Sequence, residues 1–393
     1  MSDTDRPEAG GAGRVSTEES PSPSTAPAGV LSGVETLRRY ALTVLANRRG
    51  AVPRPAYVTY LVSYRCNARC GMCDSWRMRP GPELTVAQAR QVFEKLRPLD
   101  AVRLTGGEPF LRPDFAELAS AVFEAAAPGL LHVTTNGSFP DRVHDLAAAF
   151  PAPKRLWFMV SLDGVGETHD QSRGRKVTYQ KALETIRRLA GLRERGVRVS
   201  VNHTVISPRS LADAEALREE VEGLGVDVQT VLAYAESSMY GLANRGKKAT
   251  HAIVPRGYPL HPDLGGTDVI GFVEREMERV ELSHDPRLRL GKGYYLRGLL
   301  ARLRDEPDPR PKPRCVALRS HLRLLPDGRV PVCQFNTEVV GSLLDSSLEE
   351  LWNAASTREA RDWVDACPGC WAECEVVPSA IYTGDLVGQL CSS

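Results

Sequence analysis

Hydrophobic residues along the chain follow two alternating patterns. Short apolar, β-branched runs recur six times, and longer stretches with apolar residues at helical spacing lie between and after them. The short runs are residues 56–63, 101–105, 130–136, 156–163, 198–206 and 226–234. The helical stretches are residues 85–97, 112–126, 141–150, 179–196 and 210–225. This alternation predicts six βα units and an α/β fold with a parallel sheet, because each crossover between parallel strands needs a helix.

The hydrophobic pattern leaves the kind of sheet open. Six βα units fit an open doubly wound sheet and a partial barrel equally well. The strands are apolar nearly throughout, so we expect helices or other elements to cover both faces of the sheet. Residues 235–266 lose periodicity and contain several Gly and Pro residues, which is typical of a functional or a disordered loop. Two more helices are predicted, near 268–282 and 294–304.

Changes in composition divide the chain into five parts. Residues 1–30 are rich in Pro, Ser, Gly and Glu and predict a disordered tail. Residues 31–54 hold one amphipathic helix and a linker, and the βα units with the following helices make one large domain over 55–304. The Pro-rich segment 305–313 predicts a second linker. A small cysteine-rich α+β domain follows at 314–393.

Charge and hydropathy exclude several classes of function. The chain has 50 Lys and Arg against 49 Asp and Glu, so it lacks the basic surface of a nucleic-acid or anionic-membrane protein. No stretch approaches the ~20 apolar residues of a membrane span, and the N-terminus lacks the apolar run of a signal peptide. We therefore expect a cytoplasmic protein, in which the nine cysteines stay reduced and their clustering indicates metal binding and not disulfides.

Three cysteines stand close together directly after the first predicted strand. The segment "SYRCNARCGMCDSW" (63–76) contains Cys66, Cys70 and Cys73 at CxxxCxxC spacing. Thiolates suit iron–sulfur clusters or zinc, and a structural zinc site needs a fourth protein ligand. Three thiolates in one loop instead fit a cuboidal cluster with one iron left open for substrate or cofactor. A zinc site completed by a distant residue is the alternative.

Further motifs follow the cysteines in order, at the ends of later strands. "TGGEP" (105–109) ends the second strand, "SLDG" (161–164) the fourth, and "SRG" (172–174) comes just beyond. With the cysteines, they resemble the radical S-adenosylmethionine (radical SAM) enzymes over about residues 55–235. The resemblance implies a partial (β/α)6 TIM-like barrel holding a [4Fe-4S] cluster, with S-adenosylmethionine as the ligand of the fourth iron. It also implies cleavage of that cofactor to a 5′-deoxyadenosyl radical, which abstracts a hydrogen atom from the substrate.

The resemblance assigns cofactor-binding roles to residues after the second strand. Gly106 and Gly107 allow the backbone to approach the amino group of the methionine part, and Glu108 accepts a hydrogen bond from that group. Taken alone, "GGEP" is also an ordinary turn before a helix.

Residues on the fourth and fifth strands complete the implied cofactor site. Ser161 and Asp163 match contacts to the ribose or carboxylate, and Arg173 pairs with the cofactor carboxylate. Asn202 and Thr204 face the same cavity. Two aromatic residues flank the cysteines, Tyr64 and Trp76, and each is interpreted either as packing over the cluster or adenine or as an ordinary core residue.

A second set of cysteines lies in the last 80 residues. The segment "LRLLPDGRVPVC" predicts a β-hairpin that turns at Asp327–Gly328, and Gly328 stands five residues before a cysteine. This arrangement resembles the SPASM domain, or its shortened twitch form, which carries auxiliary iron–sulfur clusters. The implied ligands of one auxiliary [4Fe-4S] cluster are Cys315, Cys333, Cys367 and Cys370, with Cys374 competing for the last place. A zinc ribbon is the alternative, and Cys391 is interpreted as a free thiol.

The motifs together favour a radical SAM oxidoreductase or modifying enzyme. Its substrate would be a peptide or a small metabolite, and a flavodoxin or ferredoxin would supply the electron. For a peptide substrate, residues 235–266 would help form the channel, and a separate peptide-recognition protein would be needed. The alternatives are a non-catalytic iron–sulfur or zinc scaffold, an electron-transfer protein and, among enzymes, an epimerase; a methyltransferase is disfavoured because no cobalamin-binding domain is recognised.

Overall fold

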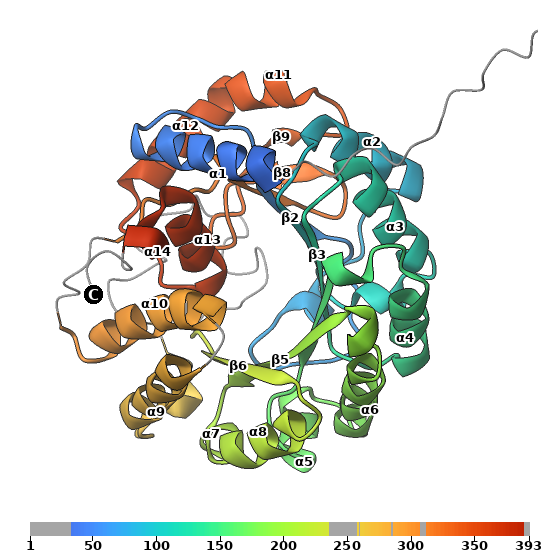
Figure 1. Cartoon of the computed structure of the whole chain (residues 1–393), viewed down its shortest axis with the longest axis vertical. Helices are drawn as coiled ribbons and strands as arrows, with labels where there is room; N and C mark the ends of the chain where they lie inside the picture. The colour runs from blue at the N-terminus through green and yellow to red at the C-terminus, as the bar shows by residue number, and fades with distance from the viewer. Residues whose placement is uncertain (1–32, 236–257, 259, 284–285, 307–311, 389–393) are drawn as a thin grey trace, which may run out of the picture.

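Seven parallel strands form the central sheet in the described part of the computed structural model (Figure 1). The structure describes residues 33–235, 258, 260–283, 286–306 and 312–388. The strands are Tyr57–Leu61 (β1), Ala101–Thr105 (β2), Leu130–Thr135 (β3), Leu156–Ser161 (β4), Arg198–Val205 (β5), Asp227–Leu232 (β6) and His321–Leu324 (β7). Their order is β6-β5-β4-β3-β2-β1-β7. Neighbours from β1 to β6 follow the chain without the reversal of a doubly wound sheet, so the partial barrel is confirmed.

Helices cover the outer side of this ring of strands (Figure 1). They are Val86–Leu96 (α2), Phe115–Ala126 (α3), Pro140–Ala149 (α4), Glu167–Ser172 (α5), Thr178–Ala190 (α6), Pro208–Ala212 (α7) and Ala214–Glu222 (α8). All six predicted strands and the five predicted helical stretches are present. The stretch predicted as one helix at 210–225 is divided at Asp213, whose carboxylate accepts a hydrogen bond from the Val165 backbone N–H (3.0 Å).

The two faces of the sheet differ in polarity. Outward-pointing side chains are apolar and fully buried against the helices, among them Val58, Val102, Val133, Phe158 and Val201. The alternate residues of the same strands point into the ring and are mostly polar, among them Thr59, Arg103, His132, Ser200 and Asn202. Contrary to our expectation, the strands are therefore not apolar nearly throughout. The apolar residues of the outer face pack against helices, and several inner residues stay partly exposed.

The seventh strand comes from the cysteine-rich C-terminal region. β7 pairs in parallel with β1, and the following strand Arg329–Pro331 (β8) pairs with Val339–Ser342 (β9). The predicted turn forms, because the Gly328 N–H donates to the Leu325 carbonyl (3.0 Å) and Gly328 adopts φ +84°. The Leu325 N–H also donates to the Arg329 carbonyl across this turn (2.9 Å), but the hairpin extends no further, because β7 pairs with β1 and β8 pairs with β9. β7 satisfies backbone groups that would be left open on β1.

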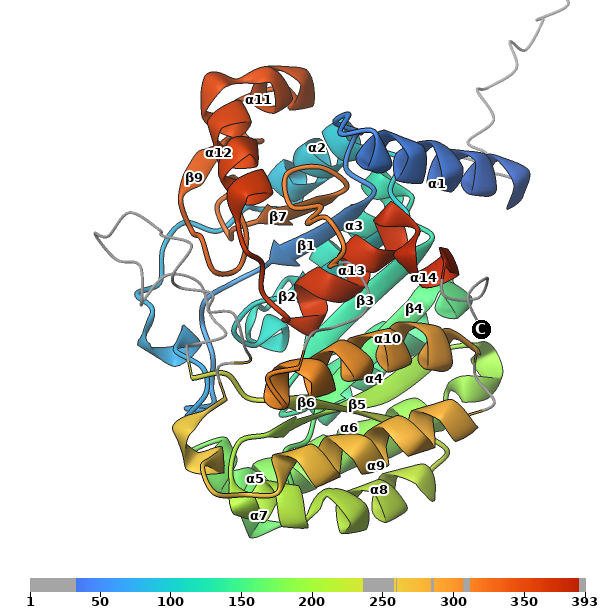
Figure 2. The ribbon, with the colours of Figure 1, turned by 90° about the vertical axis from the view of Figure 1, so that its left-hand side faces the viewer.

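The remaining helices close the molecule beyond β6 and β7. Val269–Leu282 (α9) and Pro286–Leu303 (α10) run side by side (Figure 2). The C-terminal helices are Leu348–Asn353 (α11), Ala355–Ala366 (α12), Glu373–Thr383 (α13) and Asp385–Gly388 (α14), and the N-terminal helix is Gly33–Arg48 (α1). α1 packs against α13, where Asn47 Nδ2 donates to the Tyr382 carbonyl (2.9 Å).

Several sequence predictions fall on residues that the structure leaves undescribed. The tail at 1–30, Cys391, most of the segment 235–266 and the middle of the linker 305–313 lie outside the described residues. The domain boundaries stay predictions. Among the described helices, none is both long and apolar enough to cross a bilayer.

Candidate functional site

The CxxxCxxC motif lies in the loop after β1, at the carboxyl end of the sheet. Cys70 is buried, and Cys66 and Cys73 are partly exposed. Neighbouring strand ends hold this loop in place. The Arg69 N–H donates to the Arg173 carbonyl (2.8 Å), and Asn136 Nδ2 donates to Asn67 Oδ1 (2.8 Å). The loop is therefore positioned by the segments that follow β3 and β4.

The two glycines of "TGGEP" bring the loop after β2 against the cysteine loop. The Gly107 N–H donates to the Ser63 carbonyl, and the Glu108 N–H donates to the Arg65 carbonyl, both at 2.8 Å. A Cβ at residue 107 would lie 2.1 Å from the Arg65 carbonyl oxygen, and one at residue 106 would lie 2.3 Å from the Ser63 carbonyl oxygen. Glycine is required at both positions for this approach. Their contact with the methionine amino group stays a prediction.

Glu108 is completely buried beneath this junction. One carboxylate oxygen accepts hydrogen bonds from the Phe110 N–H (3.1 Å) and the Thr135 hydroxyl (2.8 Å), and the other accepts one from the Asn136 N–H (2.7 Å). Burial raises the pKa of Glu108 to about 7, although these donors act to lower it. The carboxyl group thus joins the ends of β2 and β3, and its predicted bond to the cofactor would be an additional contact.

Arg173 links the end of β4 to the cysteine loop. Its Nη2 donates to Asp163 Oδ1 (2.8 Å), and its Nη1 donates to the Cys70 sulfur (3.6 Å). Asp163 also accepts hydrogen bonds from the Ser172 hydroxyl (2.8 Å) and the Thr204 N–H (3.3 Å). Although burial acts to raise the pKa of Asp163, Arg173 holds it below its usual value. This ion pair was not predicted, and the assigned cofactor contacts of both residues stay predictions.

Two strand positions predicted to face the cavity lie next to each other. Ser161 on β4 and Asn202 on β5 are direct register partners. Thr204 lies two residues further along β5, and its hydroxyl accepts a hydrogen bond from Asn202 Nδ2 (3.1 Å). Residues two apart on a strand share a face, so these polar groups line the inner face near its carboxyl end.

The aromatic residues beside the cysteines have different surroundings. Tyr64 is partly buried against a small apolar cluster of Leu61 and Leu325. Trp76 donates from Nε1 to the Cys70 carbonyl (3.3 Å), and the guanidinium of Arg77 lies 4.6 Å from its ring centre. Trp76 therefore contacts the cysteine loop, whereas Tyr64 packs against apolar core residues.

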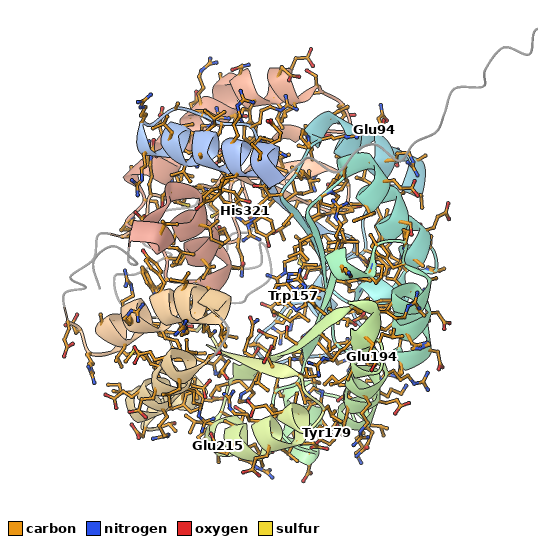
Figure 3. The ribbon with its side chains drawn as sticks, in the orientation of Figure 1. Glu94, Trp157, Tyr179, Glu194, Glu215 and His321 are labelled. Carbon is orange, nitrogen blue, oxygen red and sulfur yellow. The ribbon has the colours of Figure 1, made fainter. Side chains whose placement is uncertain are left out.

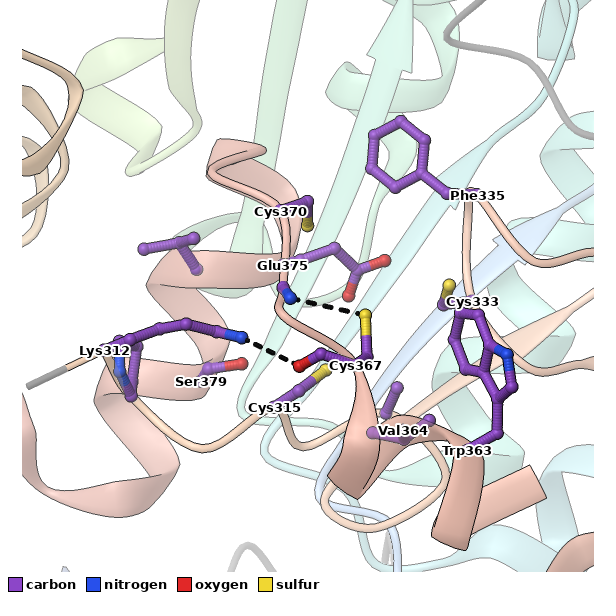
Figure 4. Close-up of a pocket in the computed structure, with 14 residues that line it drawn as sticks. Lys312, Cys315, Cys333, Phe335, Trp363, Val364, Cys367, Cys370, Glu375 and Ser379 are labelled. Atoms are coloured by element: carbon purple, nitrogen blue, oxygen red, sulfur yellow. Dashed lines mark hydrogen bonds between the residues drawn. The ribbon is translucent and has the colours of Figure 1, made fainter. Parts of the chain in front are cut away.

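The second set of cysteines surrounds a cavity in the C-terminal region (Figure 4). Four of its lining residues are the predicted auxiliary ligands Cys315, Cys333, Cys367 and Cys370. Cys374 is not among the lining residues, and its thiol donates to Gln334 Oε1 (2.9 Å) instead. The geometry brings together the four cysteines that the twitch spacing indicates; their assignment as ligands stays a prediction.

The surroundings of both cysteine sets fit iron–sulfur clusters. Backbone N–H groups point at thiol sulfurs, from Ala68 to Cys66 (3.4 Å), from Asn336 to Cys333 (3.3 Å) and from Gly369 to Cys367 (3.3 Å). Such donors stabilise thiolates bound to iron. Burial raises the pKa of Cys66 to about 11 and that of Cys73 to about 12. Iron would therefore have to supply the positive charge that keeps these thiolates ionised.

Family models agree with this geometry. The Radical SAM superfamily model matches residues 60–221, which contain the cysteine loop and the ends of β2 and β4. A SPASM model, described as an iron–sulfur cluster-binding domain, matches residues 315–374. Residues 60–221 therefore form a radical SAM domain. Radical SAM proteins bind a [4Fe-4S] cluster with S-adenosylmethionine, and the SPASM match places the second cysteine set in an auxiliary iron–sulfur domain and not in a zinc ribbon.

Curated radical SAM relatives match only part of the chain. The pre-heme d1 synthase of Dinoroseobacter shibae is 32% identical over 219 residues, which are 53% of this chain and 50% of that protein. The mycofactocin maturase MftC of Mycobacterium tuberculosis is 30% identical over 167 residues, or 41% of this chain and 40% of that protein. This radical SAM chain thus spans about half the length, or less, of these relatives.

Solved structures share the fold over most of the radical SAM chain. "Native anSMEcpe with bound AdoMet and Cp18Cys peptide" has a TM-score of 0.54 at 14% identity and covers 86% of this chain and 96% of that one. SuiB of Streptococcus suis bound to S-adenosylmethionine has a TM-score of 0.53 at 14% identity, covering 82% of this chain and 70% of that one. At this identity the likeness establishes the fold alone.

Sequence reasoning missed two parts of the radical SAM site. Asn136, at the end of β3, contacts Glu108 through its N–H and approaches the Cys66 sulfur (4.0 Å) through Nδ2. Its signal was its place directly after a strand, the same as that of "GGEP" and "SLDG". The polar inner face was missed too, although single polar residues such as Arg103 in "AVRLT" interrupt the apolar runs.

Proposed function

We propose that this chain is a radical SAM enzyme that abstracts a hydrogen atom from a substrate held inside its barrel. The observation that carries the proposal is the hydrogen-bonded junction of the cysteine loop with "TGGEP" and with Arg173. A scaffold or an electron carrier needs the cysteines alone. A second cofactor beside the cluster needs binding groups from other strands as well. The junction supplies them, because it joins the cysteine loop to the segments that follow β2 and β4.

The residues of this chain would divide the work as follows. Cys66, Cys70 and Cys73 would hold the [4Fe-4S] cluster, and S-adenosylmethionine bound there would supply the 5′-deoxyadenosyl radical on reduction. Gly106 and Gly107 would let the protein backbone approach the amino group of the methionine part, and Arg173 would offer its positive charge to the carboxylate of the cofactor. The inner faces of the strands would hold the substrate away from bulk water.

The substrate of the proposed reaction is a peptide or a small metabolite. The names of similar proteins support both kinds of substrate. The relatives include a mycofactocin maturase, a subtilosin biosynthesis protein and a pre-heme d1 synthase. An auxiliary cluster next to the barrel suits an oxidation, because it can accept the electron that the substrate radical gives up. A flavodoxin or ferredoxin is the proposed reductant, and a peptide substrate would call for a separate recognition protein.

The test is release of 5′-deoxyadenosine, measured by mass spectrometry. Anaerobically reconstituted protein receives S-adenosylmethionine and a strong reductant, and a triple Cys66→Ala, Cys70→Ala, Cys73→Ala variant serves as the control. We expect product from the wild type alone. Absence of product from protein with a full iron content would favour the scaffold or electron carrier.

A further inference from the structure

One layer of inward-pointing residues crosses the barrel at mid-height. Register pairs join Thr59 on β1 with Arg103 on β2, Arg103 with His132 on β3, and His132 with Trp157 on β4. Residues paired in this way on neighbouring parallel strands point to the same side of the sheet. Figure 3 shows Trp157 on the inner side of the ring. Arg103 therefore points into the barrel, and it is partly exposed there.

Arg103 has only one hydrogen-bond partner among the residues that the structure describes. Its Nε donates to the Thr134 hydroxyl on β3 (3.1 Å). Across the described chain, no carboxylate forms an ion pair with its guanidinium. Thr134 lies on the same inner face, so this bond leaves both terminal nitrogens of Arg103 free to donate. A guanidinium fork without an acidic partner is suited to bind a carboxylate with two hydrogen bonds.

The other arginine next to Thr59 in this layer, on the opposite neighbouring strand, is already paired with a carboxylate. Arg323 on β7 donates from Nε (3.0 Å) and Nη2 (2.7 Å) to one oxygen of Glu375. The other Glu375 oxygen lies 3.5 Å from His321 Nδ1. Arg323 and Glu375 thus balance each other, and Arg103 adds an uncompensated positive charge close to them.

The neighbouring histidine does not change this balance. His132 stacks on Trp157 with ring centres 4.4 Å apart, and the guanidinium of Arg198 lies 5.9 Å from the centre of the indole ring. Burial, with Arg103 and Arg198 nearby, lowers the pKa of His132 well below its usual value. The stack forms a neutral wall beside the guanidinium.

We infer that Arg103 binds a carboxylate group of the substrate inside the barrel. The inference rests on the proposed function, because it assumes that the barrel holds the substrate. Arg103 lies two residues before the end of β2, so roughly 7 Å of strand separates it from "TGGEP". An anchored carboxylate would leave the rest of the molecule reaching toward the cysteine loop. The substrate class is thereby narrowed to organic acids and to peptides with an acidic side chain or a free carboxyl terminus.

Binding of a matched pair of probes tests this inference. The full chain with its clusters is dialysed anaerobically against 2-naphthoate or its uncharged amide, 2-naphthamide. We expect the wild type to prefer the acid by about tenfold, the effect of one charge-assisted bidentate contact. Arg103→Gln should lose this preference, and Arg103→Lys should keep only part of it. Thr134→Val keeps the positive charge of Arg103 but removes the hydroxyl that accepts from Arg103 Nε. This variant should bind the acid roughly threefold more weakly than the wild type.

The control variant lies on the outside of the barrel. Arg90→Gln removes an exposed arginine on α2 that pairs with Glu124 (2.6 Å), and it should bind the acid as the wild type does. Equal binding of acid and amide to the wild type, no binding of either, or an acid preference that survives in Arg103→Gln would each overturn the inference. Release of 5′-deoxyadenosine by the same wild-type preparation is measured separately. Selective acid binding without that product would leave the carboxylate site standing and remove the proposed function.

Discussion

Arg173 donates from Nη1 to the sulfur of Cys70 across 3.6 Å, and the two residues belong to segments 103 positions apart. The same guanidinium is paired with the fully buried Asp163 (2.8 Å). One cation thus neutralises a carboxylate on the β4 side and approaches a thiol on the β1 side. The position of the cysteine loop therefore depends on the charge balance at the end of β4.

Replacing Asp163 by Asn should destabilise this junction strongly. The change keeps the shape of the side chain but leaves the buried Arg173 charge without its counter-ion, which costs about 3 kcal/mol. Anaerobic urea denaturation measures the loss. Ser172→Ala is the matched control, because it removes only a neutral hydrogen bond to the same carboxylate and should cost about 1 kcal/mol. Equal losses of unfolding free energy in the two variants would show that the ion pair stabilises the junction no more than a neutral hydrogen bond does.

A methyl group at residue 107 should separate the loops after β1 and β2. The Cβ of Gly107→Ala would lie 2.1 Å from the Arg65 carbonyl oxygen, so the loops must move apart. A steric penalty of about 2 kcal/mol corresponds to roughly 30-fold weaker binding of S-adenosylmethionine, measured by calorimetry on protein with a full iron content. Gly81→Ala is the control, since nothing lies within 4 Å of its Cβ. Unchanged affinity in Gly107→Ala would contradict the role given to this contact.

The two candidates for the last auxiliary ligand should respond differently to substitution. Cys370 lines the cavity with Cys315, Cys333 and Cys367, whereas Cys374 donates its thiol to Gln334. We expect Cys370→Ser to lower the iron content by about one cluster of the two, and Cys374→Ser to leave it unchanged. Iron and acid-labile sulfide analysis of the two variants decides the matter. The reverse pattern would make Cys374 the ligand.

The free energy of unfolding should depend on His169 between pH 6.5 and 5. His169 is fully buried, and its Nδ1 accepts a hydrogen bond from the Asp163 N–H (3.0 Å). Burial lowers its pKa to about 4 from the usual 6.5, so protonation favours the unfolded state. Its contribution is complete above pH 6.5 and is lost as the pH falls toward 4, by about 2 kcal/mol at pH 5.

The variant His169→Asn isolates this contribution. Its amide oxygen can accept the same Asp163 N–H but does not titrate. We expect the difference in unfolding free energy between pH 6.5 and 5 to be about 2 kcal/mol smaller in this variant than in the wild type, measured by denaturant titration. Parallel profiles for the two proteins would mean that other buried histidines dominate the acid response.

Much of the radical SAM fold could be predicted from the sequence because its signals are local. The six strands and the intervening helices are each defined by the spacing of neighbouring apolar residues, and the cysteine loop by three residues within eight positions. The choice of a partial barrel over a doubly wound sheet depended on the order of the motifs along the chain. The pairing of β7 with β1 could not be predicted, because it joins residues more than 260 positions apart through backbone groups that every residue carries.

The side-chain network of the site was harder to predict for a related reason. Arg173 and Asp163 were both singled out, yet their mutual ion pair depends on how the segment after β4 folds back. Arg103 was overlooked because one arginine in a five-residue apolar run resembles a surface position. Only the register with His132 and Thr59 reveals that it points inward.

Because β7 lies next to β1, the chain is not expected to divide into two independently stable fragments. A chain cut before residue 314 would leave β1 as an unprotected edge strand, with open N–H and C=O groups available to any other chain. Such a fragment is expected to aggregate and not to persist as a free barrel. The barrel and the cysteine-rich region would then have to fold together and be inherited as one unit. Joining this barrel to a different C-terminal domain would require redesigning the edge of β1.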